Sequence, residues 1–181
     1  MTKEGSYSHL VIRSVLDKYQ YLEKKERAFI TRVSEGTIQY MIELDYIINQ
    51  FSKVKVNKMK PVIRNILRMS VYQLKYMDSV PDSAVCNEAV KLAKRKGFGS
   101  LSGFVNGVLR NISRNLSTIT YPDGQKDQIQ YLSVRYSMPE WIVRQWINDY
   151  GMERTVSVLQ AFLQETPVTI RTNLLKITPE A

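Results

Sequence analysis

Apolar side chains recur at helical spacing over most of this chain. Between residues 23 and 51 there is no proline, and apolar positions three and four apart line one face: Phe29, Val33, Tyr40, Leu44, Ile47, Ile48 and Phe51. Gly36 lies within this run and marks either a close helix crossing or a break into two helices. Pro61 suits the first turn of the next helix, whose apolar stripe ends near Met77.

Two further helices are predicted between residues 82 and 114. Residues 78–83 form a turn in which Asp82 or Ser83 can cap the helix that follows. Gly97 is suited to end that helix after a basic last turn. Ser100 or Ser102 can begin the next helix, which is the most amphipathic segment of the chain.

The pattern changes around residues 117–125, where Thr, Pro, Asp and Gly accumulate, and we place a boundary there. Three shorter helices are predicted at residues 129–136, 139–150 and 153–165. We expect Trp141, Trp146 and Tyr150 to form part of their core rather than a platform for base stacking. Branched residues at 168–175 predict a β-strand, which cannot be stable alone.

The net charge of +9 is concentrated in the middle of the chain. Residues 53–114 hold 13 basic and 3 acidic residues, whereas charges on either side nearly cancel. Such a concentration favours a polyanionic partner, although basic residues also form ordinary solvated helix faces. No apolar run suits a membrane span, and the polar N-terminus does not resemble a signal peptide. The single cysteine excludes an intrachain disulfide and favours a cytoplasmic location.

No catalytic constellation emerges from the residue types. His9 is the only histidine and has no metal-ligand or triad partner nearby. Cys86 has the pattern of a small buried hydrophobe; the alternative, a nucleophile, lacks a base. The glycine-rich segment 97–100 follows a helix and matches no phosphate-binding loop. Glu43 and Asp45 lack a third ligand for a metal ion.

The remaining candidate chemistry is a basic surface. Lys60, Arg64, Arg68 and Lys75 fall within about 80° of one another around the helix that begins at Pro61. Tyr72 and Tyr76 lie near this row, either as half-buried core residues or as stacking platforms for unpaired bases. The predicted RNA-binding residues are Lys60, Arg64, Arg68, Lys94, Arg95, Lys96, Arg110 and Arg114.

Three segments resemble the NusB family in order and spacing: ILRMSVYQL at 66–74, VPDSAVCNEAVKLAK at 80–94 and GFVNGVLRN at 103–111. The resemblance covers about residues 7–116 and implies an all-α, antiparallel NusB-like bundle that binds RNA. Free NusB factors act in transcription antitermination and normally end near the position of Leu116.

The later segments YSMPEWIV at 136–143 and TPVTIRTN at 166–173 resemble the Sun/Fmu-type small-subunit (16S) ribosomal RNA cytosine-C5 methyltransferases. The resemblance implies that residues 117–181 are a helical connecting segment leading into a truncated RRM-like module. It places the S-adenosylmethionine site and two catalytic cysteines in a later Rossmann domain, so this chain is expected to hold neither catalytic residues nor cofactor. Cys86 corresponds to neither cysteine.

The family also has a helix before Gly5, where only four residues stand, so we expect an open apolar groove suited to self-dimerisation or misassembly. The implied partners are small-subunit ribosomal RNA and the catalytic domain in cis, with a second copy or a ribosomal protein as further candidates. Two alternatives stay open: an antitermination or protein-interaction module, and a structural scaffold.

Overall fold

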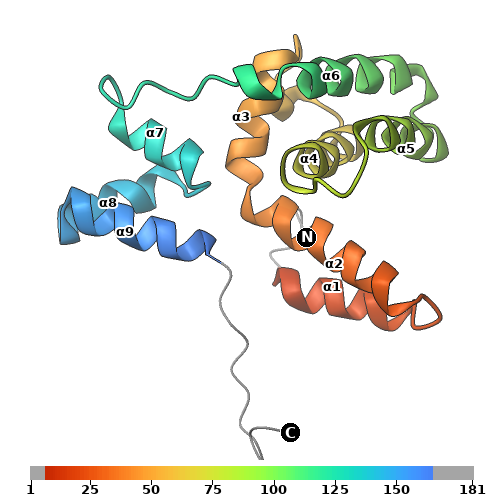
Figure 1. Cartoon of the computed structure of the whole chain (residues 1–181), viewed down its shortest axis with the longest axis horizontal. Helices are drawn as coiled ribbons and strands as arrows, with labels where there is room; N and C mark the ends of the chain where they lie inside the picture. Colours follow the sequence, from red (N-terminus) through yellow and green to blue (C-terminus); the bar gives the residue numbers. More distant parts are fainter. Residues whose placement is uncertain (1–6, 165–181) are drawn as a thin grey trace, which may run out of the picture.

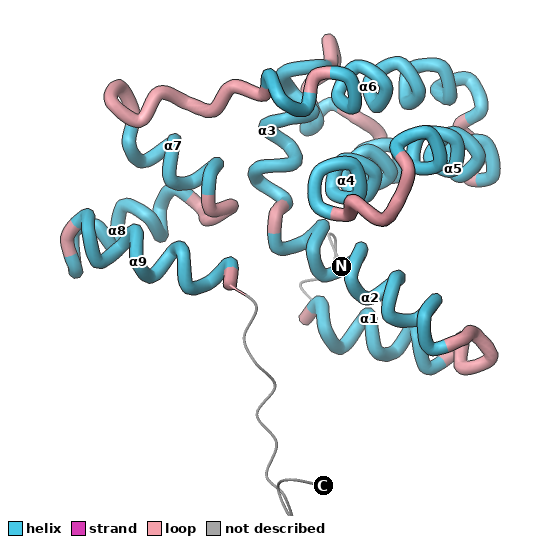
Figure 2. Tube along the Cα trace, viewed as in Figure 1, coloured by secondary structure: helices cyan, strands magenta, loops and turns pink. Residues whose placement is uncertain are grey.

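The computed structural model describes residues 7–164, which form helices and connecting loops with no strand in this range (Figures 1 and 2). This confirms the expected all-α class; the predicted strand at 168–175 lies outside the described residues. The α-helices are α1 (Ser8–Asp17), α2 (Lys24–Gln39), α3 (Met41–Phe51), α4 (Pro61–Tyr76), α5 (Asp82–Arg95), α6 (Ser102–Arg114), α7 (Gln128–Arg135), α8 (Glu140–Tyr150) and α9 (Met152–Leu163).

Gly36 marks a close crossing between α2 and α4. A Cβ atom placed there would lie 2.0 Å from Cζ of Tyr72, so only glycine lets the two helices approach this closely. The long helical run also breaks, but at Tyr40, the residue between α2 and α3. Of the two interpretations of Gly36, the close helix crossing is therefore correct and the helix break is wrong, because Gly36 lies inside α2 and the run breaks four residues later.

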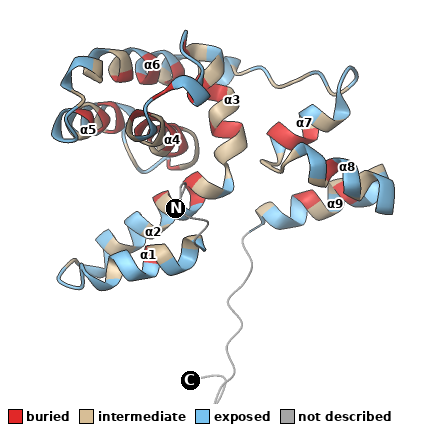
Figure 3. Ribbon diagram, turned by 180° about the vertical axis from the view of Figure 1, so that it is seen from behind, coloured by how far each residue is buried: buried red, intermediate tan, exposed pale blue. Residues whose placement is uncertain are grey.

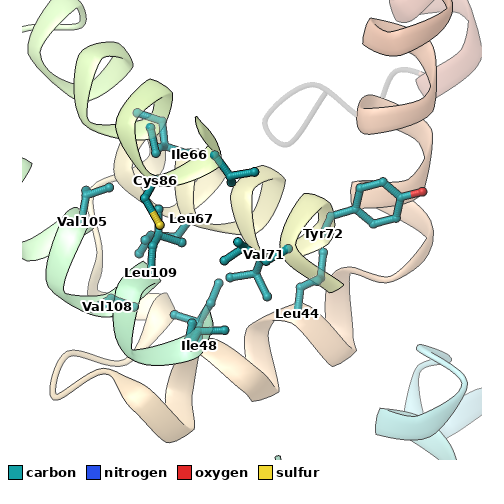
Figure 4. Close-up of a cluster of buried hydrophobic side chains, with 14 of the residues drawn as sticks. Leu44, Ile48, Ile66, Leu67, Val71, Tyr72, Cys86, Val105, Val108 and Leu109 are labelled. Atoms are coloured by element: carbon teal, nitrogen blue, oxygen red, sulfur yellow. The ribbon is translucent and has the colours of Figure 1, made fainter. Parts of the chain in front are cut away.

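The main core lies where α3, α4, α5 and α6 meet. Leu44, Ile47, Leu67, Val71 and Leu109 are fully buried there, and Figure 4 shows several of them converging from different helices. Each such side chain contributes roughly 1.5–3 kcal/mol through removal of its apolar surface from water. Buried residues gather in these helices, whereas the outer face of α1 and α2 is largely exposed (Figure 3).

The end of α5 follows the prediction at Gly97. That residue has φ of 82°, and the N–H of Phe98 donates to the carbonyl of Ala93 at 2.9 Å, which closes the helix in a Schellman turn. The predicted cap at the start of α5 is wrong, because Pro81 occupies the cap position and no side chain caps the helix. Asp82 instead accepts a hydrogen bond from the hydroxyl of Ser113 at 2.5 Å, which ties α5 to α6.

Helices α7, α8 and α9 pack around a second, smaller core of Leu132, Val143 and Leu159. Trp146 packs against this core as expected, but Trp141 and Tyr150 are 67% and 56% exposed. The prediction for these two residues is wrong, because α8 turns the face that carries Val143 inward and leaves both rings on the outside.

Helix α3 joins the two parts of the molecule and lies between them in Figure 1. The backbone N–H of Ile42, in the first turn of α3, donates to the hydroxyl oxygen of Ser137 at 3.0 Å. N–H groups in a first turn lack partners within their own helix, so Ser137 caps α3 from the turn after α7. At the other end of α3, the side-chain amide of Gln50 donates to the carbonyl of Thr120 at 2.9 Å.

Candidate nucleic-acid interface

One end of the bundle collects exposed cations from two helices. Helix α4 and helix α5 are joined by residues 77–81 and pack against each other, so the start of α4 lies at the same end of the bundle as the end of α5. Four of the predicted residues are exposed at this end: Lys60, Lys94, Arg95 and Lys96. Lysines of the preceding loop add to the same region: Lys53, Lys55 and Lys58.

Two more predicted cations lie on the exposed face of α6. Arg110 and Arg114 are one turn apart, and both are exposed. The Nε of Arg110 donates to Oδ1 of Asn106 at 2.9 Å, which fixes the start of the guanidinium group on the helix surface. The remaining donors of this fork are then available to an outside acceptor.

These six exposed cations, hereafter the basic face, are Lys60, Lys94, Arg95, Lys96, Arg110 and Arg114. None of them forms a salt bridge with another residue in the range 7–164. Arg110 lies beside the middle of α5, and Arg114 lies toward the start of α5, where its neighbour Ser113 contacts Asp82. Exposed cations without counter-charges attract phosphate groups along this length of the bundle. Their binding of RNA stays a prediction, but the geometry leaves them accessible.

Arg68 does not share this accessibility, and we correct its place in the predicted set. Its Nε and Nη2 donate to the two carboxylate oxygens of Asp45 at 2.6 and 2.5 Å, and its side chain is 9% exposed. A buried bidentate pair of this kind holds two helices, here α3 and α4, and its guanidinium does not face solvent. The helical-wheel row on α4 could not reveal this pairing, because Asp45 comes from another helix.

Arg64 lies between these two cases. Its side chain is half-buried, and its Nε is enclosed with no hydrogen-bond partner among the described residues. A buried donor without a partner costs about 1–3 kcal/mol, which an outside acceptor would offset.

A buried carboxylate, Glu43, was not anticipated as part of a network. It is fully buried and accepts from Lys75 Nζ at 2.5 Å, from Tyr121 OH at 2.5 Å and from Tyr76 OH. Burial, then these bonds to Glu43, raises the pKa of both tyrosines above their ordinary range. The signal in the sequence was a carboxylate one turn from Tyr40 and Ile47, inside the apolar stripe.

The tyrosines of α4 serve the core. Tyr72 is buried and reaches toward α2 (Figure 4), and the ring of Tyr76 stacks on that of Tyr40 with centroids 4.3 Å apart. The core interpretation of Tyr72 and Tyr76 is therefore correct, and neither ring presents a free face for base stacking.

The remaining candidates for chemistry lie apart from one another. Cys86 is buried in the main core, and this burial raises the pKa of its thiol, as expected of a structural cysteine. His9 is exposed on α1 beside the ring of Tyr7. Within residues 7–164 no group of three or more His, Cys, Asp or Glu side chains is placed to bind a metal ion.

An apolar groove of about 450 Å³ lies between α2, α4 and α5. Phe29, Val33, Ile66, Met69 and Leu92 line it, and Phe29 is 42% exposed. An open apolar groove was expected from the sequence, and self-dimerisation through this groove stays a prediction. None of the described helices is long and apolar enough to span a membrane.

Two family models match this chain. The model of the NusB family matches residues 1–114. The model of the RsmF/B-like methyltransferase ferredoxin-like domain matches residues 138–181, which include α8 and α9.

Curated relatives divide into the same two groups. The "Probable ribosomal RNA small subunit methyltransferase B" proteins of Bacillus subtilis and Synechocystis are 36% and 32% identical over 176 and 179 residues. Each alignment covers 97% of this chain but only 38% and 39% of the relative, so the chain spans about two fifths of their length. The "Transcription antitermination protein NusB" of Dictyoglomus thermophilum is 41% identical over 90 residues, 49% of this chain and 62% of that protein.

The match to the NusB family model spans all of α1 to α6, the helices that build the main core and carry the basic face. It also covers well over half of the sequence, and the observed bundle is the fold expected from the motifs at 66–74, 80–94 and 103–111. The chain therefore belongs to the NusB family.

Proposed function

We propose that this chain is the RNA-binding part of a ribosomal RNA cytosine-C5 methyltransferase and that it positions small-subunit ribosomal RNA. The observation that carries the proposal is the basic face: six exposed cations without an acidic partner among the described residues. Two relatives named as small-subunit ribosomal RNA methyltransferases align with nearly all of this chain, which supports the choice of RNA.

The division of labour follows from the residues. The basic face binds phosphates through charge and bidentate hydrogen bonds, which hold an RNA in position without reading its sequence. Methyl transfer from S-adenosylmethionine is assigned on this proposal to a catalytic domain in cis, in the cytoplasm. Helices α7–α9, joined to α3 by Ser137 and by the Glu43 network, would fix the angle between the bundle and that domain.

The test is a salt titration of RNA binding. We expect the affinity of the full chain for a small-subunit ribosomal RNA fragment to fall by roughly 50–340-fold between about 50 and 200 mM salt, for about four to six phosphate contacts to single-stranded RNA. The triple variant Lys94→Gln, Arg95→Gln, Lys96→Gln should bind more weakly and lower the salt slope by about 2. Glutamine removes charge without placing a carboxylate at the end of α5.

The matched control is Lys24→Gln, Lys25→Gln, Arg32→Gln, which removes three exposed cations from α2. It should leave affinity and slope unchanged. Salt-independent binding, or an equal loss in both triple variants, would contradict a role for the basic face. Circular dichroism melts of all three proteins separate loss of contacts from loss of fold.

The apolar groove favours a second candidate function, recruitment of a protein. Its lining of Phe29, Ile66 and Leu92 suits the apolar face of a partner helix. Capture of a ribosomal protein by the full chain, lost on Phe29→Glu but retained by the glutamine triple variant, would favour this function over RNA positioning. If neither RNA nor a protein binds, the chain is a structural scaffold for the catalytic domain.

A further inference from the structure

A small hollow of about 250 Å³, with both polar and apolar lining, lies on the surface between α5 and α6. Its lining comes from Asn87 and Val90 of α5 and from Ser102, Gly103, Asn106 and Arg110 of α6. It is smaller than the ~300 Å³ at which sites for drug-sized ligands begin, which suits a single ring system. Because Arg110 belongs to the basic face, the hollow adjoins a surface already suited to phosphate.

The hydrogen-bonding groups around the hollow are only partly used. Asn106 accepts from Arg110 through Oδ1, and within residues 7–164 neither its NH₂ group nor the outer nitrogens of Arg110 have a hydrogen-bond partner. The amide of Asn87 has no hydrogen-bond partner among the described residues. An asparagine amide offers a donor and an acceptor side by side, which matches the polar edge of a nucleobase.

The glycines of α6 point to close approach of a partner at the same place. Gly103 and Gly107 are exposed in the most amphipathic helix, although alanine is the better helix former. A Cβ at either position would meet nothing within 4 Å, and neither residue has positive φ. Neither intramolecular packing nor backbone conformation requires glycine there. The absence of side chains at Gly103 and Gly107 leaves the α6 backbone open beside the hollow, where a planar ring of a ligand can lie against it.

We propose that this hollow receives one unpaired nucleotide of the bound RNA. The amides of Asn87 and Asn106 contact the edge of its base, the backbone at Gly103 and Gly107 supports the sugar or the base plane, and Arg110 binds the adjoining phosphate. Bases in single-stranded loops can turn outward in this way, whereas those in an A-form duplex cannot. The inference rests on the proposed RNA-binding function and adds a base-reading contact to it.

The experiment compares binding of the full chain to ten-nucleotide homopolymers of A, C, G and U, each titrated against salt. We expect a preference for one base in the wild type. Asn87→Ala should reduce that preference by about tenfold and leave the salt slope unchanged, since a base contact releases no counterions. The matched control is Asn148→Ala. Asn148 is an exposed residue of α8 whose side chain has no hydrogen bond among the described residues.

Gly103→Ala gives a second readout that a merely structural role would not move. The substitution should raise the Tm by about 2–4 °C through helix propensity and at the same time weaken RNA binding several-fold. Because the variant is expected to be more stable than the wild type, weaker binding cannot be attributed to unfolding.

The outcomes distinguish this inference from the proposed function. Salt-dependent binding without a base preference would overturn the nucleotide site and leave the basic face in place. The same conclusion would follow if Asn87→Ala and Gly103→Ala left RNA binding unchanged. No salt-dependent binding by the wild type would overturn both. Loss of preference in the Asn148→Ala control would also count against the hollow as the site that reads the base.

Discussion

Three cations on one side of the α4 helical wheel, counting Lys60 just before the first turn, have different roles in the folded molecule. Lys60 is exposed, Arg68 is paired with Asp45, and Lys75 contacts Glu43. An exposed cation can bind phosphate, whereas a buried pair is kept by the cost of leaving one charge alone. At the scale of the residue, the partner across the helix interface therefore decides what a charge does.

Removal of Asp45 should show that Arg68 is structural. We expect Asp45→Ala to lower the free energy of unfolding by about 3 kcal/mol, because the guanidinium would remain buried without its counter-charge. Urea unfolding measures the change. Replacing both partners, as in Asp45→Ala with Arg68→Met, should restore part of the loss. Glu88→Ala, which breaks the exposed pair with Lys91, is the control and should produce no measurable change.

The buried tyrosines should make the fold sensitive to alkaline pH. The pKa of Tyr76 and of Tyr121 is raised above 10.0 by burial and by Glu43, so both hydroxyls keep their protons in the folded state when the unfolded chain loses them. Their stabilising contribution is complete below about pH 10 and falls above it by about 1.4 kcal/mol per pH unit for each tyrosine. Between about pH 8 and 11, the free energy of unfolding should fall less steeply with pH in Tyr121→Phe than in the wild type. Equal slopes in the two proteins would contradict this assignment.

At the scale of the element, the crossing of α2 and α4 depends on a single missing side chain. Tyr72 fills the space over Gly36, and its ring lies among those of Tyr40 and Tyr76, so it has little room to move. Helix propensity and packing therefore make opposite predictions for alanine at this position.

We expect packing to win at Gly36. Gly36→Ala should lower the free energy of unfolding by about 2 kcal/mol, because its Cβ would displace the buried ring of Tyr72. Chemical denaturation measures the loss, and near-ultraviolet circular dichroism reports the tyrosine rearrangement. Gly107→Ala, in open space on α6, is the matched control and should be stabilising. A stabilised Gly36→Ala protein would show that α2 can move away from α4 at little cost.

At the scale of the whole molecule, two hydrophobic cores are joined through polar contacts. Glu43 of α3 binds Lys75 and Tyr76 of α4 and also Tyr121 of the segment that leads to α7. Arg135 of α7 lies over the ring of Tyr121 with its Cζ 5.5 Å from the centroid. This network, the cap by Ser137 and the Gln50–Thr120 hydrogen bond connect the main core to the part that holds α7–α9.

Neutralising Glu43 should uncouple the two parts. We expect Glu43→Gln to destabilise the fold by about 3 kcal/mol, since Lys75 and both tyrosines lose their charged partner. Hydrogen exchange should then show loss of protection first in α7–α9, while the core of α3–α6 stays protected. Glu35→Gln on the exposed face of α2 is the control and should change neither quantity. Uniform loss of protection would mean that the two cores unfold as one unit.

The sequence by itself determined the helical class, most helix positions and the roles of Gly97, Cys86 and Trp146. These features depend on periodicity and on chain conformation over a few neighbouring residues, so local reasoning reaches them. The same is true of the concentration of positive charge in residues 53–114 and of the motifs typical of the NusB family.

Only the tertiary structure decided which charged and aromatic residues are available to a partner. Asp45 and Arg68 are 23 positions apart, and Glu43 and Tyr121 are 78 apart, so no local pattern could pair them. Exposure of Trp141 likewise depends on which face α8 turns inward, and the hollow beside Asn87 exists only because α5 and α6 pack together. Periodicity shows that a helix has an apolar face, but burial of a charge depends on whether another helix brings its counter-charge.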